Sequence, residues 1–298
     1  MSIDVPHYRI MGKLGTGADS TIYQAKALKT GVVYAIKHVK VTTPESHKTI
    51  ELMKDEHQCG SSMDHPALRK TFELRLVKRR LTLKSAMLFM EYVEGQSLSE
   101  IARSLGILQS LYLFEKAADA LAEMHKIGYV HADLKPGNIL VMSDQEIKLI
   151  DFGQSCKINQ VKPRVQGTID YMAPEQGAKE RLDARTDVFG LGATFHKVLT
   201  GKPIATKMNQ NLDVHSLGRL GVRKSDNEQP SLEELPPVIS KLIVDCCQQN
   251  PDKRPNDMHD FISRCRMARL TLAKAVETEE AKEAKAAKAA NKSQADPT

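Results

Sequence analysis

The hydrophobic pattern of the chain changes near Gly95, and this change limits the folds that the chain can adopt. Before Gly95, short runs rich in β-branched residues, such as 32–39, alternate with turn residues, as is typical of β-strands. After Gly95, apolar residues recur at helical spacing, and 111–124 has the pattern of a buried amphipathic helix. The sequence therefore predicts an α+β fold in which a β-rich part precedes a helix-rich part.

The composition is that of an ordinary soluble globular protein. The 43 Lys and Arg residues exceed the 37 Asp and Glu residues only slightly, and no segment resembles a nucleic-acid-binding module. No apolar run approaches the roughly 18 residues of a membrane span, and the first residues lack the pattern of a secretory signal. The five cysteines show no metal-ligand spacing, which favours reduced thiols and a cytoplasmic location.

The last part of the chain, 271–298, differs sharply in composition from the rest. It consists almost entirely of Ala, Lys, Glu and polar residues, and no large aliphatic residue follows Val276. Such residues favour helix, but a helix without an apolar stripe is marginal in water. We expect a frayed helix that passes into a disordered end.

Five short motifs occur in a fixed order along the chain. Gly-Thr-Gly at 15–17 and Ala-Ile-Lys at 35–37 come first. His-Ala-Asp-Leu-Lys-Pro-Gly-Asn at 131–138 precedes Asp-Phe-Gly at 151–153 and Ala-Pro-Glu at 173–175. Each motif alone is weak evidence, since the first reads equally well as a plain hairpin turn. Their order and spacing make coincidence improbable.

Together these motifs resemble the eukaryotic-like serine/threonine protein kinase family, and the similarity runs over 8–270. The resemblance implies the bilobal protein kinase fold, with a β-rich N-lobe (8–89), a hinge (90–94) and a helical C-lobe (95–270). It also implies transfer of the γ-phosphoryl group of ATP, with Mg²⁺, to protein hydroxyls. The sequence Tyr-Met-Ala-Pro-Glu-Gln at 171–176 favours a bacterial member of the family.

The resemblance places the nucleotide at the first motifs and the hinge. Glycines 15 and 17 allow the backbone to approach the phosphates because no Cβ obstructs the contact. The third glycine of the family is Ser20 here, which predicts a stiffer loop. The nucleotide-binding residues implied in this way, besides the Lys37 pair, are Leu14, Gly15, Thr16, Gly17, Ile22, Ala35, Met90, Glu91 and Val93.

Lys37 matches the lysine that contacts the α- and β-phosphates, and it needs a carboxylate to orient it. Counting back from His65 by the interval usual in the family identifies this partner as Glu56. The alternative is that Glu56 belongs to a charge pair on the surface of its helix.

Gly60 is a departure from the family pattern. The family has an apolar side chain at this position that stacks on the Phe of Asp-Phe-Gly, which is Phe152. Either Met63 or Cys59 fills the gap, or the helix register is different and Glu56 is not the partner of Lys37.

The resemblance assigns the chemical step to the motif at 131–138. Asp133 matches the aspartate that accepts the proton of the substrate hydroxyl, and Lys135 matches the lysine that neutralises the moving phosphate. Lys at this position is typical of kinases that act on Ser or Thr. Asn138 and Asp151 would hold Mg²⁺, which prefers oxygen ligands. A buried aspartate with a structural role is the alternative for Asp133.

Further positions support or modify this assignment. Glu175 matches a carboxylate that pairs with Arg254, and Asp187 matches one that holds the backbone of the catalytic loop. Ala132 replaces the arginine that most family members use to bind a phosphate on the activation segment. Thr168 matches a hydroxyl that contacts the catalytic aspartate and lysine.

Two other functions remain open from the sequence. A pseudokinase or scaffold module would keep the fold without the reaction, but such proteins usually lose residues that this chain keeps, namely Lys37, Asp133, Asn138 and Asp151. A small-molecule kinase would lack Ala-Pro-Glu at 173–175. We therefore expect a protein substrate, and the sequence does not identify that substrate or a regulatory partner.

Overall fold

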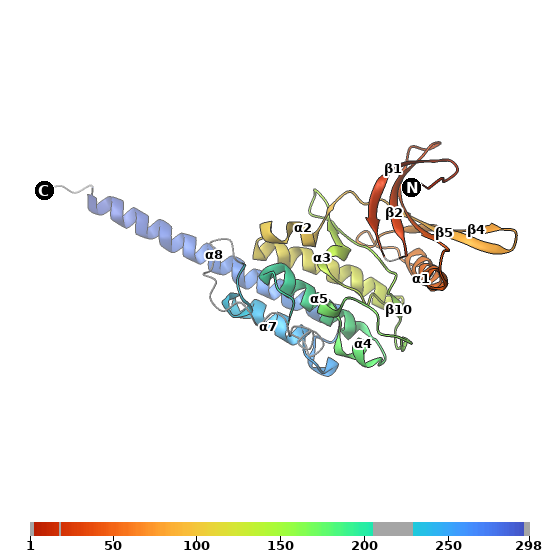
Figure 1. The fold of residues 1–298 in the computed structure, drawn as a ribbon. Coiled ribbons are helices and arrows are strands. Elements are labelled where there is room, and N and C mark those ends of the chain that lie inside the picture. Colours follow the sequence, from red (N-terminus) through yellow and green to blue (C-terminus); the bar gives the residue numbers. More distant parts are fainter. Residues whose placement is uncertain (1–2, 18, 205–228, 295–298) are drawn as a thin grey trace, which may run out of the picture.

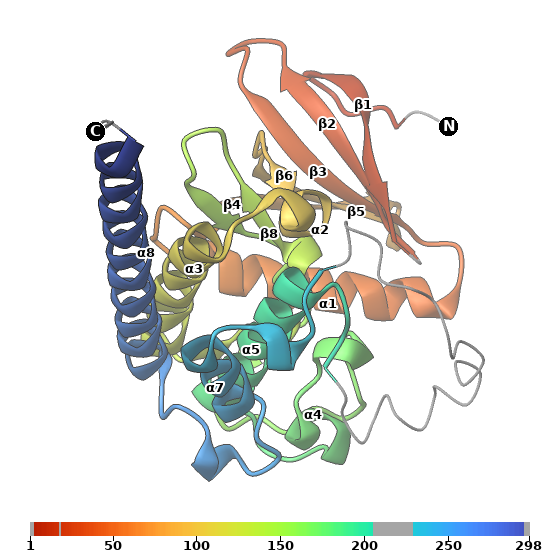
Figure 2. The ribbon, with the colours of Figure 1, turned by 90° about the vertical axis from the view of Figure 1, so that its left-hand side faces the viewer.

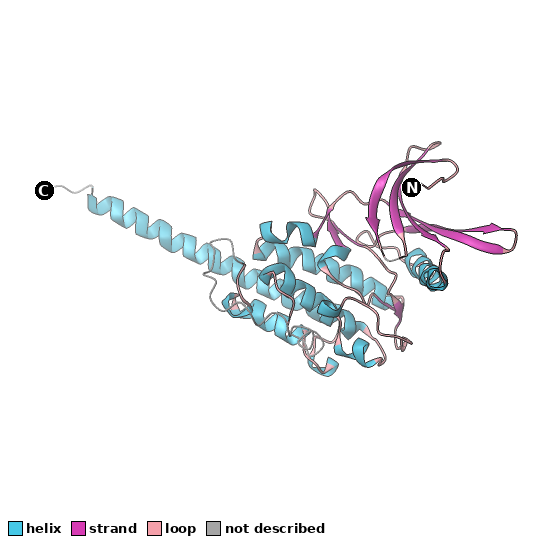
Figure 3. Cartoon of the chain, viewed as in Figure 1, coloured by secondary structure: helices cyan, strands magenta, loops and turns pink. Residues whose placement is uncertain are grey.

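Figure 3 shows most of the strands gathered in one lobe and most of the helices in the other, which is the expected α+β arrangement. The computed structural model describes residues 3–17, 19–204 and 229–294. An antiparallel five-stranded sheet with the order β1-β2-β3-β5-β4 forms the first lobe. Its strands are β1 (Tyr8–Thr16), β2 (Thr21–Ala27), β3 (Val33–Lys40), β4 (Thr71–Arg79) and β5 (Thr82–Glu91).

Helix α1 (Pro44–Ser61) packs against this sheet. Its start is fixed by a capping box, in which Thr43 and Ser46 exchange hydrogen bonds between side chain and backbone. The face that carries Ile50 and Met53 is buried in an apolar cluster with residues of β3 and β5. Because the same face continues along the helix, Glu56 is also buried beneath the sheet.

The second lobe is built around four helices that surround a large apolar core (Figure 1). They are α3 (Ile107–Lys126), α5 (Ala184–Thr200), α7 (Pro237–Cys246) and α8 (Met258–Gln294). The Phe114 and Phe195 rings, 4.5 Å apart, join α3 to α5 in this core. The helix expected at 111–124 lies within α3.

Short elements join these helices and carry the motifs. The strands are β6 (Gln96–Ser97), β7 (Tyr129–Val130), β8 (Ile139–Val141), β9 (Ile147–Leu149) and β10 (Cys156–Lys157). The helical elements are α2 (Leu98–Ile101), α4 (Pro174–Ala178), η1 (Ala102–Ser104), η2 (Pro136–Asn138), η3 (Ile169–Tyr171), η4 (Leu232–Glu234) and η5 (Pro251–Lys253). Since β8 pairs with β9 in a tight hairpin, the motif at 131–138 and the motif at 151–153 lie side by side.

Helix α8 begins in the body of the protein and ends outside it (Figure 1). Its first turns lie along α3 (Figure 2), and Glu115 on α3 forms ion pairs with Arg266 and Arg269 on α8. The expected helix in 271–298 is continuous through Gln294. The fraying of this helix and the disordered end of 271–298 stay predictions, and 295–298 lies outside the described residues.

Among the residues that the structure describes, no helix combines the length and the apolar character needed to cross a membrane. The five cysteines are free thiols, as the sequence predicted.

The contact between α5 and α7 depends on Gly192. A Cβ at this position would lie 2.4 Å from the Cβ of Cys246 on α7. Alanine is a better helix former than glycine by about 1 kcal/mol, but this clash forces the helices apart. We expect Gly192→Ala to lower the free energy of unfolding by about 1–3 kcal/mol in urea. Gly12→Ala on β1, where a Cβ meets nothing within 4 Å, is the control. A Gly192 variant as stable as the wild type contradicts this account of the contact.

Candidate active site

Two cavities between the lobes contain the residues that the first motifs and the hinge contribute. They have volumes of about 290 and 480 Å³ and share Ile22, Arg69 and Ile150 in their walls. The first is lined by Leu14, Ala35, Glu91 and Val93, and the second by Gly15, Thr16, Gly17, Lys37, Glu56, Met90, Asn138 and Asp151. All the nucleotide-binding and metal-binding candidates therefore face one continuous region. A cavity of about 570 Å³ lies apart from it, between α1 and 153–166.

Lys37 on β3 lies in contact with Glu56 on α1. Its Nζ is 2.6 Å from Glu56 Oε2 and 3.8 Å from Asp151 Oδ1. Burial lowers the pKa of Lys37, but the negative charges of Glu56 and Asp151 outweigh it and raise the pKa overall, so the ammonium group stays charged. Because the Glu56 side chain is only 1% exposed, the alternative of a surface charge pair is wrong.

The gap at Gly60 is filled by Thr71, at the start of β4. A Cβ at Gly60 would lie 2.2 Å from Thr71 Oγ1 and 3.5 Å from Phe152 Cδ2. Thr71 therefore takes the place that the sequence analysis gave to Met63 or Cys59. The helix register that brings Glu56 to Lys37 is the observed one.

Asp133, Lys135 and Thr168 form one hydrogen-bonded group. Asp133 Oδ1 accepts bonds from Thr168 N (2.9 Å) and Thr168 Oγ1 (3.0 Å), and Oδ2 accepts one from Lys135 Nζ (2.8 Å). Lys135 Nζ also donates to Thr168 Oγ1 at 3.1 Å. Asn138 Nδ2 donates to the backbone oxygen of Asp133 at 2.8 Å. These bonds fix the direction of both Asp133 oxygens, and the Thr168 contacts are those that the resemblance implied.

Asp187, at the start of α5, holds the backbone of the motif at 131–138, as the resemblance implied. Its carboxylate is buried and accepts bonds from His131 N (2.8 Å) and Ala132 N (2.9 Å), with His125 Nε2 at 2.8 Å. Burial raises the pKa of Asp187, but His125 outweighs this effect and lowers it. The bonds also hold Ala132 at φ 61°, a conformation that costs about 1–3 kcal/mol for a residue with a Cβ.

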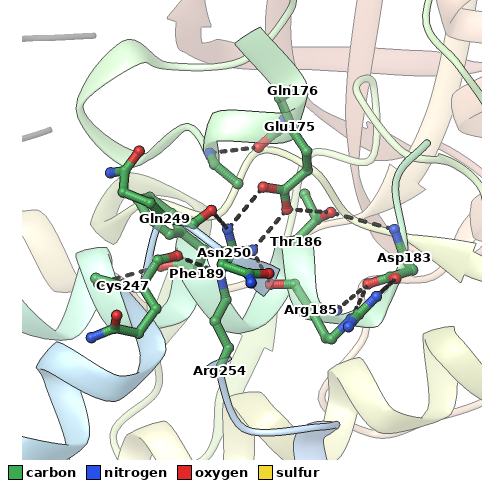
Figure 4. Close-up of polar contacts among 12 residues, drawn as sticks. Glu175, Gln176, Asp183, Arg185, Thr186, Phe189, Cys247, Gln249, Asn250 and Arg254 are labelled. Atoms are coloured by element: carbon green, nitrogen blue, oxygen red, sulfur yellow. Dashed lines mark hydrogen bonds and ion pairs between the residues drawn. The ribbon is translucent and has the colours of Figure 1, made fainter. Parts of the chain in front are cut away.

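Glu175 and Arg254 form a buried pair with two parallel contacts (Figure 4). Arg254 Nη1 lies 2.7 Å from Glu175 Oε1, and Nη2 lies 2.8 Å from Oε2. Thr186 Oγ1 donates to the same carboxylate at 2.9 Å, and Arg254 also donates to the backbone oxygen of Arg185. The pair thus joins α4, α5 and the segment after η5.

Asn138 and Asp151 are the candidates for binding a metal ion. Burial raises the pKa of Asp151, but the charges of Lys37 and Arg69 outweigh it, so the carboxylate is ionised at neutral pH. The described residues contain no cluster of three His, Cys, Asp or Glu side chains that could hold a metal. Mg²⁺ needs only one or two such ligands when phosphates supply the others, so this pair fits it.

Two buried cations at the site were missed by the sequence analysis. Arg69 is 5% exposed, and its Nη2 donates to Glu56 Oε1 at 3.0 Å. Lys148 on β9 is 7% exposed and pairs with the hinge residue Glu91 at 2.8 Å. Nothing in the local sequence signals their burial, because each partner lies on a distant segment.

The family model for the protein kinase domain matches residues 8–265. Serine/threonine-protein kinase 1 of Arabidopsis thaliana is 27% identical over 91% of this chain and 32% of that protein. Serine/threonine-protein kinase pkn2 of Myxococcus xanthus is 27% identical over 89% and 33%. Serine/threonine-protein kinase PknA of Mycobacterium tuberculosis is 27% identical over 83% and 58%. The chain thus spans about a third of the first two relatives. Because plants and bacteria both appear, the bacterial origin stays a prediction.

Removal of the buried carboxylate of Glu175 should destabilise the protein strongly. In Glu175→Ala the guanidinium of Arg254 stays buried without its counter-charge, and we expect a loss of about 3–5 kcal/mol in the free energy of unfolding. Lys241→Ala is the control, because it removes the exposed ion pair with Asp245 and should cost under about 0.5 kcal/mol. Both values come from urea unfolding. Equal losses of unfolding free energy in the two variants would show that the buried pair stabilises the protein no more than the exposed pair does.

Proposed function

Because the chain belongs to the protein kinase domain family, we propose that it is an ATP-dependent serine/threonine protein kinase. It transfers the γ-phosphoryl group of ATP, with Mg²⁺, to Ser or Thr hydroxyls of proteins. The observation that carries this proposal is the convergence of Lys37, Asn138 and Asp151 on one cavity wall, beside the group formed by Asp133 and Lys135. The kinase domain covers 8–270.

Asp133 is the base of the proposed reaction. One of its carboxylate oxygens accepts the proton of the substrate hydroxyl. At the same time the hydroxyl oxygen attacks the γ-phosphorus, and the bond between the γ-phosphorus and the β-phosphate oxygen breaks, so that ADP leaves. Lys135 neutralises the charge on the transferring group. The hydrogen bonds from Thr168 and Lys135 support these roles because they hold the carboxylate in a fixed orientation before substrate arrives.

Lys37, Asn138 and Asp151 position the phosphates. The metal complex of ATP supplies the transferable group, and its Mg²⁺ neutralises charge on the phosphate oxygens. Asn138 and Asp151 would hold the metal through their side-chain oxygens, and Lys37, kept charged by Glu56, would bind the α- and β-phosphates. The Gly17 amide donates to the Ser20 carbonyl at 2.8 Å, so the ends of β1 and β2 are joined by a backbone hydrogen bond beside the cavity that Gly15, Thr16 and Gly17 line.

The pseudokinase and small-molecule alternatives are weaker. The charged groups needed for transfer all have partners that orient them, which a scaffold module does not require. Gln176, beside the Ala-Pro-Glu motif, donates to the backbone oxygen of Ala132 at 2.9 Å, which supports a peptide-docking segment held against the catalytic loop. Free thiols favour the reducing cytoplasm. A regulatory partner and the native substrate are not assigned.

The kinase also belongs to the type without an arginine before the catalytic aspartate. Ala132 leaves no cation there that a phosphate would have to neutralise. The Thr168 hydroxyl is already engaged by Asp133 and Lys135. In the activation segment before it, 154–166, Ser155 is the only residue with a side-chain hydroxyl. We infer that the segment adopts its working form without phosphorylation.

The first test of this function removes the carboxylate at the metal site. Asp151→Asn keeps the side-chain volume but removes its charge, and we expect a loss of at least about a hundredfold in phosphotransfer. The assay uses labelled MgATP and a generic protein acceptor, with phosphoamino-acid analysis for Ser and Thr. The exposed Asp144→Asn variant should keep the wild-type rate. Wild-type turnover by a folded Asp151 variant would overturn the assignment.

The second test concerns phosphorylation. After phosphatase treatment and removal of the phosphatase, the initial rate on an added substrate should stay within about twofold of the untreated rate. Ser155→Ala should behave in the same way. A fall of tenfold or more, or about 1.4 kcal/mol in the barrier, would show that a phosphate is needed.

A further inference from the structure

Arg69 brings a second positive charge to Glu56. Lys37 Nζ contacts Glu56 Oε2 at 2.6 Å, and Arg69 Nη2 contacts Oε1 at 3.0 Å, so each carboxylate oxygen has its own cation. The Arg69 side chain is 6% exposed and lines both cavities of the cleft. Its Nε is buried and has no hydrogen-bond partner among the described residues.

The segment that carries Arg69 is attached to the second lobe. The backbone amide of Arg69 donates to the backbone oxygen of Leu149 at 3.1 Å, and the Leu149 amide donates to the backbone oxygen of Ala67 at 2.8 Å. Leu149 ends β9, two residues before Asp151. The ion pair of Arg69 with Glu56 therefore links α1 to the strand that leads into the metal site.

Gly60 is what allows this segment to lie so close to α1. Gly60 follows Glu56 by one helical turn, and a Cβ there would meet Thr71 Oγ1 at 2.2 Å. Thr71 in turn follows Arg69 by two residues. A larger side chain at Gly60 would push the start of β4 away and carry the guanidinium of Arg69 with it. The unusual glycine and the unusual buried arginine are thus parts of one contact.

The Glu56 carboxylate cannot rotate freely, because each of its two oxygens is in contact with a cation. A buried carboxylate with one cation can turn or withdraw, whereas one held at both oxygens presents Oε2 to Lys37 in a single orientation. The guanidinium carbon also lies 6.0 Å from the centre of the Phe152 ring, within the range of a weak cation–π contact.

We propose that Arg69 is a positioning residue, which holds Glu56 and α1 where Glu56 orients Lys37. The contact is made by residues outside the activation segment, so it places α1 whether or not that segment is phosphorylated. This inference rests on the proposed kinase activity, because Lys37 acts on the nucleotide.

The experiment is a double-mutant cycle on Arg69 and Glu56. Arg69→Met keeps the unbranched apolar stem of the side chain but removes the charged guanidinium, and we expect kcat/KM for ATP to fall at least about tenfold. Glu56→Gln should cause a loss of similar size. If Arg69 acts through Glu56, the double variant loses no more than about twofold beyond the worse single variant.

Arg75→Met is the matched control, since Arg75 lies on β4, six residues after Arg69, but pairs with Glu73 and lines neither cavity of the cleft. It should stay within about twofold of the wild type. Urea unfolding checks that each variant is folded. If Arg69→Met does not fold, Arg69→Gln is measured against the same thresholds.

An Arg69 variant within about twofold of the wild type overturns the proposal, and so do losses that multiply in the double variant. Titration with a fluorescent ATP analogue separates this result from failure of the proposed function. If the wild type binds the analogue but transfers no phosphate, the kinase assignment fails. In that case a tenfold weaker affinity of Arg69→Met, with Arg75→Met unchanged, still supports the positioning role, and equal affinities overturn it.

Discussion

The buried carboxylate of Glu56 is the constraint on which the cleft depends. A buried charge without partners costs several kcal/mol, so the fold must bring cations to it. Lys37 comes from the centre of the sheet, and Arg69 comes from a segment bound to β9 in the other lobe. Sheet, helix and second lobe therefore meet at one carboxylate. Asp151 lies 3.8 Å from the same lysine, so the meeting point is also the edge of the candidate metal site.

The second lobe uses buried carboxylates in the same way to support loops. The candidate catalytic side chains at 131–138 lie on a segment with little regular structure, where backbone amides need other partners. Asp187 supplies these partners to two successive amides, and Glu175 ties the activation segment to Arg254. Helices α4 and α5 position these carboxylates, so the loop residues that bind them are held in place by the helical core. In both lobes, therefore, a buried carboxylate on a helix holds neighbouring segments in place.

The sequence predicted the α+β order, the main strands and helices, and the residues that meet in the cleft. These features are encoded by short periodicities and motifs that can be recognised locally. The positions of Arg69 and Lys148 could not be predicted, because burial of a cation depends on a carboxylate elsewhere in the chain. Lys148 is separated from Glu91 by 57 positions. Thr71 fills the space beside Gly60, and this contact likewise joins segments that are apart in the sequence. It could be recognised only in the folded structure, where β4 lies against α1.

Hydrogen bonds from Ser155, Thr168 and Gln176 hold the activation segment, 151–176, against the loop at 131–138. The methyl group of Ala132 packs in an apolar cluster with Cys156 and Leu182, where an arginine would introduce a charge that needs an anion. Lys162 is already buried in this region, where it donates to the Gln154 carbonyl, and burial lowers its pKa. Under the proposed function, a phosphate on this segment would meet the methyl group of Ala132 where the family has an arginine, and the nearby ammonium group of Lys162 already donates to a carbonyl. Helix α1 is linked to β9, and the activation segment packs on an apolar surface. Contacts within the protein therefore hold both of them in position.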